Sequence, residues 1–267
     1  MVNKPYLALI DADTWSYDVA FAAERKDEDG EAFTLPFSYC MDLIDFRLEG
    51  VLEAVGCKEY AMYLTGRDNF RHDIATILPY KGNRKQPKPW HYENIRQYLT
   101  FTYKAQVVDG MEADDILSIQ QTEMGTDSVI VSRDKDLRTV EGWHYGYPLS
   151  IQPEKPLEYI TEMGYLTLSK KRKLSGGGMR LFYAQCIMGD KVDNIQGLPR
   201  HGDVKAYNIL EECENETELY EKTLETYQNY YDDEEKARQA LHENASLLWM
   251  TRELDEDGRP VLWKPPK

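Results

Sequence analysis

The sequence predicts an α/β fold with a largely parallel β-sheet flanked by helices. Four short segments are apolar, rich in β-branched or aromatic side chains, and end in polar or acidic residues, which is typical of buried strands. They span residues 6–11, 59–65, 105–110 and 128–134. Between the first two, residues 37–55 carry apolar side chains at steps of three or four, the pattern of an amphipathic helix. Strand and helix therefore alternate, and this alternation favours a parallel sheet.

The composition limits the class of protein. The 267 residues, 42% of them hydrophobic, suffice for one large core or two smaller ones. A net charge of -15 argues against a nucleic-acid partner unless the acids hold divalent cations, because such binding depends on Lys and Arg. The four cysteines have no Cys-x-x-Cys spacing, and neither a signal peptide nor an apolar run of about 18 residues occurs. We therefore expect a cytoplasmic protein with no membrane segment.

Acidic residues gather where the predicted strands end. They are Asp11 and Asp13 after the first strand, Glu112, Asp114 and Asp115 after the third, and Asp134 and Asp136 after the fourth. In open parallel sheets, ligands bind in the crevice outside the carboxyl ends of the strands. We therefore expect these carboxylates to meet in one crevice.

The first acidic motif, LIDADT, is compatible with two chemistries. It resembles the opening motif of the haloacid-dehalogenase-like phosphatases, in which the first Asp attacks phosphorus, and GDKVD at residues 189–193 resembles their magnesium-binding motif. That interpretation gives no role to three acids in EADD at residues 112–115, or to the residues that follow GDKVD. The alternative is that the carboxylates hold metal ions.

The stretch after GDKVD, NIQGLPRHGDVKA, favours the second chemistry. Gly197 and Gly202 flank a short turn between two helical segments, where backbone N–H groups are able to approach a phosphodiester. This stretch resembles the helix-hairpin-helix element of the 5′-nuclease superfamily. It departs from the usual wording in two places, because Arg200 replaces a Gly and Val204 replaces a Lys, with Lys205 one position later.

Other motifs of that superfamily follow in the same order along the chain. EADD resembles its central acidic motif, and SRDKDL at residues 132–137 resembles its SxDxD motif. NFR at residues 69–71 and PYKGNR at residues 79–84 resemble the segment that leads into the arch over the active site. The matches span residues 6–206, and the layout is most similar to that of the bacteriophage 5′-to-3′ exonucleases.

The resemblance implies a PIN-like 5′-nuclease core with a helical arch or clamp. We expect the core in residues 1–141, with the arch in residues 72–103. Residues 142–267 would then form a helical C-terminal subdomain with the helix-hairpin-helix at 186–210. We interpret SKKRKLSGGGMR, residues 169–180, as a basic and Gly-rich connector within it.

The function implied by the resemblance is metal-dependent hydrolysis of DNA from 5′ ends or at 5′ flaps, in replication or nucleic-acid degradation. RNA in RNA–DNA hybrids is a further expected substrate. Two Mg²⁺ ions about 4 Å apart activate the water and stabilise the leaving oxygen in such reactions, and Mn²⁺ is a substitute. Hard cations prefer carboxylate ligands, which fits this set. A K⁺ ion at the hairpin is also implied, as are a monomer and, for a phage-encoded protein, the host cytoplasm.

The resemblance assigns roles to individual residues. Asp11, Glu112 and Asp114 belong to one metal, Asp134, Asp136 and Asp193 to the other, and Asp115 and Asp190 to an outer or bridging place. The implied DNA contacts are Arg71, Tyr80, Lys81, Arg84, Gly197, Arg200, Gly202 and Lys205, of which Lys81 and Arg84 also act in catalysis. Taken singly, the acids of EADD and GDKVD have a simpler interpretation as helix caps and turn residues.

One departure from the superfamily affects the chemistry. The second strand usually ends in a metal-binding Asp, whereas here Thr65 and Gly66 stand at that place. Asp68 and Asp13 are the two candidates to replace it. If neither does, a nuclease-like protein that binds branched DNA without cutting it is the alternative.

Overall fold

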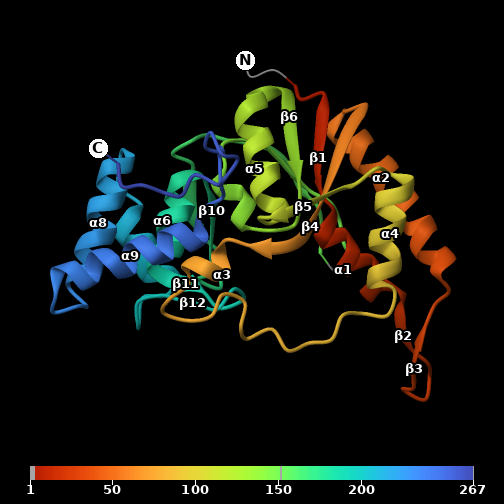
Figure 1. Cartoon of the computed structure of the whole chain (residues 1–267), viewed down its shortest axis with the longest axis horizontal. Helices are drawn as coiled ribbons and strands as arrows, with labels where there is room; N and C mark the ends of the chain where they lie inside the picture. The colour runs from red at the N-terminus through yellow and green to blue at the C-terminus, as the bar shows by residue number, and fades with distance from the viewer. Residues whose placement is uncertain (1–3, 151, 267) are drawn as a thin grey trace. The chain divides into compact units, whose positions relative to one another are not determined.

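The computed structural model describes residues 4–150 and 152–266 (Figure 1). The chain divides into two compact units whose segments alternate along the sequence. Unit 1 consists of Met1–Asp68, Lys85–Asp134 and Gly142–Tyr159. Unit 2 consists of Asn69–Arg84, Lys135–Glu141 and Ile160–Lys267.

Unit 1 is built on a six-stranded sheet in the order β5-β4-β1-β6-β7-β8. The strands are β1 (Leu7–Asp11), β4 (Glu59–Asn69), β5 (Gln106–Gly110), β6 (Ser128–Val131), β7 (Gly142–Gly146) and β8 (Lys155–Ile160). β1 lies between β4 and β6 and runs parallel to both, and β7 runs parallel to β6. The four predicted strands and the mostly parallel sheet are therefore confirmed.

Helices cover this sheet because its central strands are apolar on both faces. The helices are α1 (Ala12–Ala23), α2 (Phe37–Val55), α4 (Tyr92–Thr102) and α5 (Ala113–Met124), with a 3-10 turn η1 (Gly125–Asp127) and a small hairpin of β2 (Glu24–Lys26) and β3 (Ala32–Thr34). Ile10 of β1 packs in one core with Trp15, Ile44 and Ile95 from α1, α2 and α4. α5 packs against β1 and β6.

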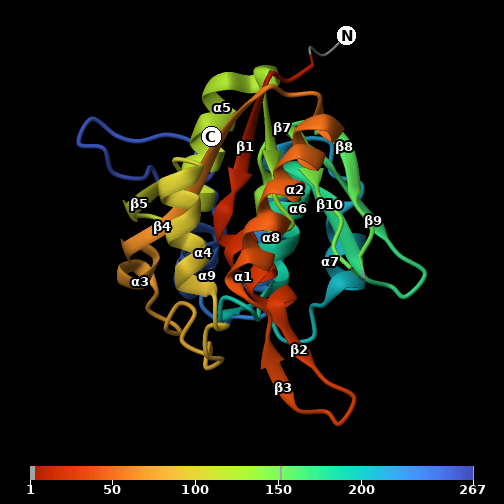
Figure 2. The same cartoon turned by 90° about the vertical axis from the view of Figure 1, so that its right-hand side faces the viewer.

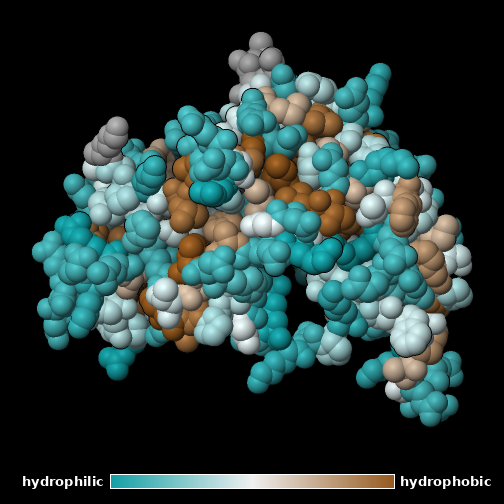
Figure 3. All heavy atoms as spheres, in the orientation of Figure 1, coloured by the Kyte–Doolittle hydropathy of each residue, from teal (hydrophilic) through white to brown (hydrophobic). Residues whose placement is uncertain are grey.

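Unit 2 is mainly helical. It contains α3 (Arg71–Ile74), η2 (Asp136–Thr139), β9 (Tyr165–Leu168), β10 (Leu174–Gly177), α6 (Gly178–Met188), β11 (Gly189–Asp190), β12 (Ile195–Gln196), α7 (Asp203–Leu210), α8 (Glu216–Gln228) and α9 (Glu234–Leu248). α6 is its central helix, since Phe182, Tyr183 and Ile187 are fully buried and α7, α8 and α9 all pack against it. The outer faces of α8 and α9 are mainly hydrophilic (Figure 3).

The division of the chain differs from the predicted boundary after residue 141. Residues 142–159 stay with unit 1 because β7 and β8 extend its sheet beyond β6. Residues 69–84 belong to unit 2 because hydrogen bonds tie them to the loop that follows α6. The predicted connector at residues 169–180 is also different, because it forms the turn of the β9–β10 hairpin, strand β10 and the start of α6.

The predicted arch segment, residues 72–103, is helical only at its ends. α3 ends at Ile74, and α4 begins at Tyr92. Ile95 and Leu99 of α4 are fully buried in the core of unit 1, so this helix is a structural element of the sheet layer. None of the helices within residues 4–150 and 152–266 combines the length and apolar character that a membrane crossing requires.

Candidate metal and nucleic-acid site

Asp11 ends the central strand β1 and is almost completely buried, with 1% of its surface exposed. One carboxylate oxygen caps α1 by accepting the N–H of Thr14 at 3.1 Å, and the other accepts the hydroxyl of Ser132 at 2.7 Å. Burial, and then the charge of Asp13, raise the pKa of Asp11 from 3.8 to about 6, although these hydrogen bonds lower it. A nearby cation would stabilise the charged form of such a group.

Ser132 connects Asp11 to a second acid of the predicted set. The Ser132 hydroxyl donates a hydrogen bond to the Asp11 carboxylate, and its oxygen accepts the backbone N–H of Asp134 at 2.9 Å. The intervening Arg133 turns away and donates to the carbonyl of Tyr147 at 2.7 Å. Our sequence interpretation included Ser132 in the SxDxD motif but gave it no role, although its place directly after a buried strand and two residues before Asp134 was a usable signal.

The EADD motif begins α5 and caps it. Glu112 and Asp115 form a capping box, in which the Glu112 side chain accepts the N–H of Asp115 and the Asp115 carboxylate accepts the N–H of Glu112 at 3.1 Å. Thr65 on β4 fixes this helix start, because its hydroxyl accepts the N–H of Ala113 at 2.9 Å. Glu112 and Asp115 thus cap α5, while Asp114 lies half-buried in its first turn.

Asp13 already has a strong partner within unit 1. Its carboxylate forms an ion pair with Arg96 of α4 at 2.6 Å and accepts the N–H of Thr65 at 2.9 Å. Arg96 also donates to the carbonyl of Thr65 at 2.6 Å. Arg96 thus neutralises the acid that was a candidate to replace the missing carboxylate, and sequence patterns gave no sign of this pairing.

A different carboxylate lies beside Gly66. A Cβ atom at Gly66 would stand 2.1 Å from Oδ1 of Asp109, which follows on the neighbouring strand β5. The same oxygen accepts the N–H of Arg67 at 2.6 Å. Asp109 therefore fills the space that a side chain at position 66 would need. Asp68, the other candidate, is exposed and has left-handed backbone geometry, with φ of 60°.

In unit 2, Lys135 lies between two acids of the predicted set. Its ammonium group is 3.4 Å from the carboxylate of Asp136 and hydrogen-bonds that of Asp190. Burial raises the pKa of Asp190, but Lys135 and the N–H groups of Val192 and Asp193 lower it further, so the net shift is downward. Lys135 thus acts as an internal cation for a buried carboxylate.

Asp193 is bound by the PYKGNR segment. Its carboxylate forms an ion pair with Arg84 at 2.7 Å and accepts a hydrogen bond from the Tyr80 hydroxyl at 3.0 Å. The Lys81 ammonium group is 3.9 Å away. The backbone N–H of Lys81 also donates to the Asp193 carbonyl at 2.9 Å. Lys81 and Arg84, which the sequence assigned to catalysis and DNA contact, are therefore paired with a predicted metal ligand.

Further hydrogen bonds join the same two segments. Asn83 donates to the carbonyl of Lys191 at 2.6 Å, and Asn194 donates to that of Pro79 at 2.9 Å. The motifs PYKGNR and GDKVDN, more than 100 residues apart, therefore form one hydrogen-bonded structure in unit 2.

Two of the residues predicted to contact DNA have buried side chains. Arg71 is fully buried and donates to the carbonyls of Leu247 and Trp249, at 2.9 and 2.7 Å. Tyr80 is 4% exposed and packs in the core of unit 2, so its ring has no face for a base. The resemblance assigns both residues to DNA, whereas their observed partners lie within unit 2.

The two glycines of the predicted helix-hairpin-helix, Gly197 and Gly202, differ in how closely other atoms pack around them in the turn between α6 and α7. A Cβ at Gly197 would lie 2.0 Å from the backbone of Met188, so Gly197 permits close packing inside the turn. Gly202 has nothing within 4 Å of its Cβ position. Arg200 adopts a left-handed conformation, with φ of 63°, which Gly adopts more easily. The side chains of Arg200 and Lys205 are exposed.

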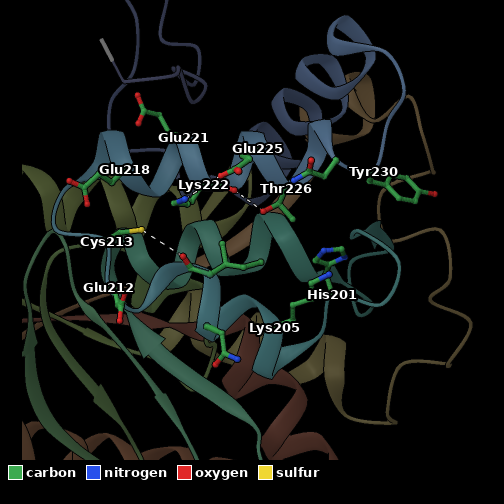
Figure 4. Close-up of a pocket in the computed structure, with 13 residues that line it drawn as sticks. His201, Lys205, Glu212, Cys213, Glu218, Glu221, Lys222, Glu225, Thr226 and Tyr230 are labelled. Carbon is green, nitrogen blue, oxygen red and sulfur yellow. Dashed lines mark hydrogen bonds and ion pairs between the residues drawn. The ribbon is translucent and has the colours of Figure 1, made fainter.

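A cavity of about 870 Å³ borders the turn, between α7 and α8 (Figure 4). His201 and Lys205 line it from the α7 side. Four glutamates also line it, namely Glu212, Glu218, Glu221 and Glu225. These four carboxylates outnumber the cations Lys205 and Lys222 in the lining, so the interior of the cavity disfavours phosphate.

The acids fit hard divalent cations by their chemistry. Carboxylates are the ligands that Mg²⁺ and Mn²⁺ prefer, and the buried Asp11 with its raised pKa favours a cation nearby. As they stand, no three His, Cys, Asp or Glu side chains converge to hold a metal ion in residues 4–150 and 152–266. Arg96, Lys135 and Arg84 each form an ion pair with one of these acids, namely Asp13, Asp190 and Asp193.

Sequence comparison connects the chain with part of a larger protein. No family profile matches it. It is 30% identical to DNA polymerase I of Bacillus caldotenax over 158 residues, which are 54% of this chain and 16% of that protein. It is 25% identical to DNA polymerase I of Bacillus subtilis (strain 168) over 268 residues, 95% of this chain and 28% of that protein. The chain thus spans less than a third of the length of these relatives.

Solved structures match nearly the whole chain. Zinc-bound T5 5′-exonuclease superposes with a TM-score of 0.63 and 16% identity, covering 92% of this chain and 89% of that one. A bacteriophage T5 flap endonuclease with DNA and metal ions gives a TM-score of 0.58 and 15% identity, covering 90% and 89%. The chain therefore has the fold of the T5 5′-exonuclease, which is the fold that the sequence resemblance predicted.

Proposed function

We propose that the chain is a divalent-metal-dependent nuclease that hydrolyses DNA at 5′ ends or 5′ flaps. The observation that carries the proposal is the group of acids at the carboxyl edge of the unit 1 sheet, where Ser132 links Asp11 to Asp134. The likeness to T5 5′-exonuclease supports it, because that structure holds zinc and a related one holds DNA and metal ions.

Asp11, Glu112 and Asp114 of unit 1 would hold the first metal. When bound, Mg²⁺ or Mn²⁺ would supply an acidified water and stabilise the leaving oxygen. The chain's own contribution is to fix the ligands, because Ser132 orients Asp11 and Thr65 fixes the start of α5. The second set contains Asp134 of unit 1 with Asp136 and Asp193 of unit 2 and stays a prediction from the sequence.

Lys81 and Arg84 would bind the phosphate of the substrate. Both now contact the carboxylate of Asp193, an acceptor of the same charge and geometry as a phosphate oxygen pair. Arg84 is half exposed, so it is accessible to a nucleic acid. Arg200 and Lys205, exposed beside the turn before α7, would contact the duplex backbone.

The decisive experiment is digestion of 5′-labelled duplex DNA and of a 5′-flap substrate with Mg²⁺, with Mn²⁺ and with chelator. An RNA–DNA hybrid tests the wider substrate range. Asp134→Asn and Asp11→Asn should abolish cleavage and keep DNA binding, while Asp127→Asn, an exposed acid outside the site, should remain active. Full activity in both site variants would refute the proposal.

Two other results would point to the alternatives. Tight flap binding with no product in either metal would identify a binding protein, which the absence of a carboxylate at Gly66 and the pairing of Asp13 with Arg96 favour. Turnover of a chromogenic phosphate monoester that Asp11→Asn abolishes would identify a phosphatase. Product lengths would separate exonuclease from flap-endonuclease action.

A further inference from the structure

The β9–β10 hairpin of unit 2 carries an isolated group of positive charges. In a chain with a net charge of -15, residues 163–189 contain five cations and no acid. Four of these cations are consecutive, at residues 170–173, and the structure places them in the turn between β9 and β10. Figure 2 shows this turn projecting away from α6 and α7.

The turn has a defined backbone, so these cations sit on a fixed support. The backbone N–H of Ser169 donates to the Lys173 carbonyl at 2.9 Å, and the backbone carbonyl of Ser169 accepts the N–H of Arg172 at 2.8 Å. Its side chain accepts the N–H of Lys173 at 3.0 Å. Lys170, Lys171 and Arg172 are exposed and make no side-chain hydrogen bond or ion pair with any described residue. Their charges therefore face solvent.

Backbone conformation adds an independent observation. Arg172 is left-handed, with φ of 58°, a conformation that Gly adopts more easily. Lys81 and Arg200, in two other turns of unit 2, are also left-handed, with φ of 53° and 63°. Strained positions that persist in a structure are candidates for function. Three turns of unit 2 thus place a cation where the backbone would favour Gly.

The hairpin is fixed to the helix that follows the proposed DNA-binding turn. Asp203, the first residue of α7, accepts the N–H of Leu174 at 2.8 Å and lies 3.4 Å from the Lys173 ammonium. β9 and β10 also pack against α7. The acid-lined cavity between α7 and α8 repels phosphate. A DNA backbone that contacts Arg200 and Lys205 is therefore favoured electrostatically along the hairpin and disfavoured along α8.

We propose that Lys170, Lys171 and Arg172 form a second contact with the phosphate backbone of duplex DNA. The proposal rests on the nuclease function proposed above and extends the DNA-binding surface beyond the turn before α7. Lys and Arg contacts with phosphates position a duplex without reading its sequence. The hairpin therefore binds the double-stranded part of the substrate irrespective of base sequence.

The test compares a hairpin variant with a charge-matched control. The hairpin variant combines Lys170→Ser, Lys171→Ser and Arg172→Gly. The control combines Lys222→Ser, Lys236→Ser and Arg238→Ser on α8 and α9. Affinity for one duplex is measured in chelator across a salt series. We expect the slope of log K against log salt to fall by about 0.9 for each lost phosphate contact in the hairpin variant, with affinity at low salt reduced by about tenfold or more. The control should stay within about twofold.

Duplexes of increasing length locate the contact. Affinity of the unmodified protein should keep rising with length after that of the hairpin variant has reached a plateau. Identical length dependence would overturn the proposal, and so would an equal loss of affinity for single strands of the same length. Arg172→Gly alone should leave the melting temperature unchanged or raised, so weaker DNA binding by this single variant is not explained by unfolding.

Cleavage assays separate this proposal from the proposed function. If the unmodified protein cuts flaps and the hairpin variant binds and cuts equally well, the hairpin proposal is wrong and the nuclease function stands. If the unmodified protein cuts nothing in Mg²⁺ or Mn²⁺, the nuclease function is wrong, and the salt and length series in chelator still decide whether the hairpin binds duplex DNA.

Discussion

Replacing Asp11 with asparagine should stabilise the metal-free protein above about pH 6. Burial and the charge of Asp13 raise the pKa of Asp11 from 3.8 to about 6. Because one pH unit corresponds to about 1.4 kcal/mol, ionising this carboxyl in the folded state costs about 3 kcal/mol. Between these pH values the folded state binds the proton more tightly than the unfolded state does. Its stability therefore falls as pH rises through this interval and stays lower above it.

Asparagine keeps the hydrogen bond that caps α1 and reverses the direction of the bond with Ser132, without the charge. Its carbonyl oxygen still accepts the N–H of Thr14, and its amide is able to donate to Ser132, whose hydroxyl already accepts the N–H of Asp134. Asp11→Ala removes the charge but also the cap of α1, which costs about 1 kcal/mol. The asparagine variant should therefore be the more stable of the two at every pH.

Urea denaturation in chelator between pH 4 and pH 8 measures the effect. The free energy of unfolding of Asp11→Asn should be close to that of the unmodified protein at pH 4 and exceed it by up to about 3 kcal/mol above pH 6. Added Mg²⁺ should stabilise the unmodified protein and not the variant. A difference that does not change with pH, or a destabilised variant at pH 7, would show that burial of this carboxylate is not unfavourable.

Three other substitutions test single contacts. Arg71→Ala should lower the free energy of unfolding by about 3 kcal/mol or more, because two carbonyls lose a buried charged donor, and unchanged stability in urea would contradict this. Arg200→Gly should raise stability by about 1 kcal/mol by relieving its left-handed backbone, and should lower the salt slope of duplex binding by about 0.9; an unchanged slope would remove Arg200 from the DNA contacts. Gly66→Asp should lower the melting temperature because its Cβ meets Asp109, and Asp109→Ser should restore part of the loss; no rescue would place the strain elsewhere.

Much of unit 1 was predictable because its signals are local. The apolar runs of β1 and β6 mark buried strands, and the acids that follow them necessarily reach one edge of a parallel sheet. α2 was predicted over its full length, since its buried residues recur with helical spacing and Gly56, in the left-handed conformation, ends it. Each of these features depends on a few neighbouring residues.

Features that depend on distant contacts were not predictable. Arg71 is buried only because the carbonyls of Leu247 and Trp249 lie beside it, 176 and 178 residues further along the chain. The hairpin strand β10 contains Gly176 and Gly177, which usually weaken strand predictions. It forms because the backbones approach closely, as a Cβ at Gly164 would lie 1.9 Å from the carbonyl of Gly177.

Net charge was a poor guide to nucleic-acid binding, because the effect of a charged side chain depends on its position and on its partners. Several acids of the predicted site are paired with Arg96, Lys135 and Arg84, so their charge is partly neutralised within each unit. Many other acids lie on α8 and α9, where they face solvent or line the cavity beside α7. Arg172 and Arg200 stand on turns of unit 2 and are exposed, with no carboxylate partner among the described residues. A strongly acidic chain is therefore able to present a basic surface to DNA, because the field at short range depends on the nearest charges and distant ones are screened over about 10 Å.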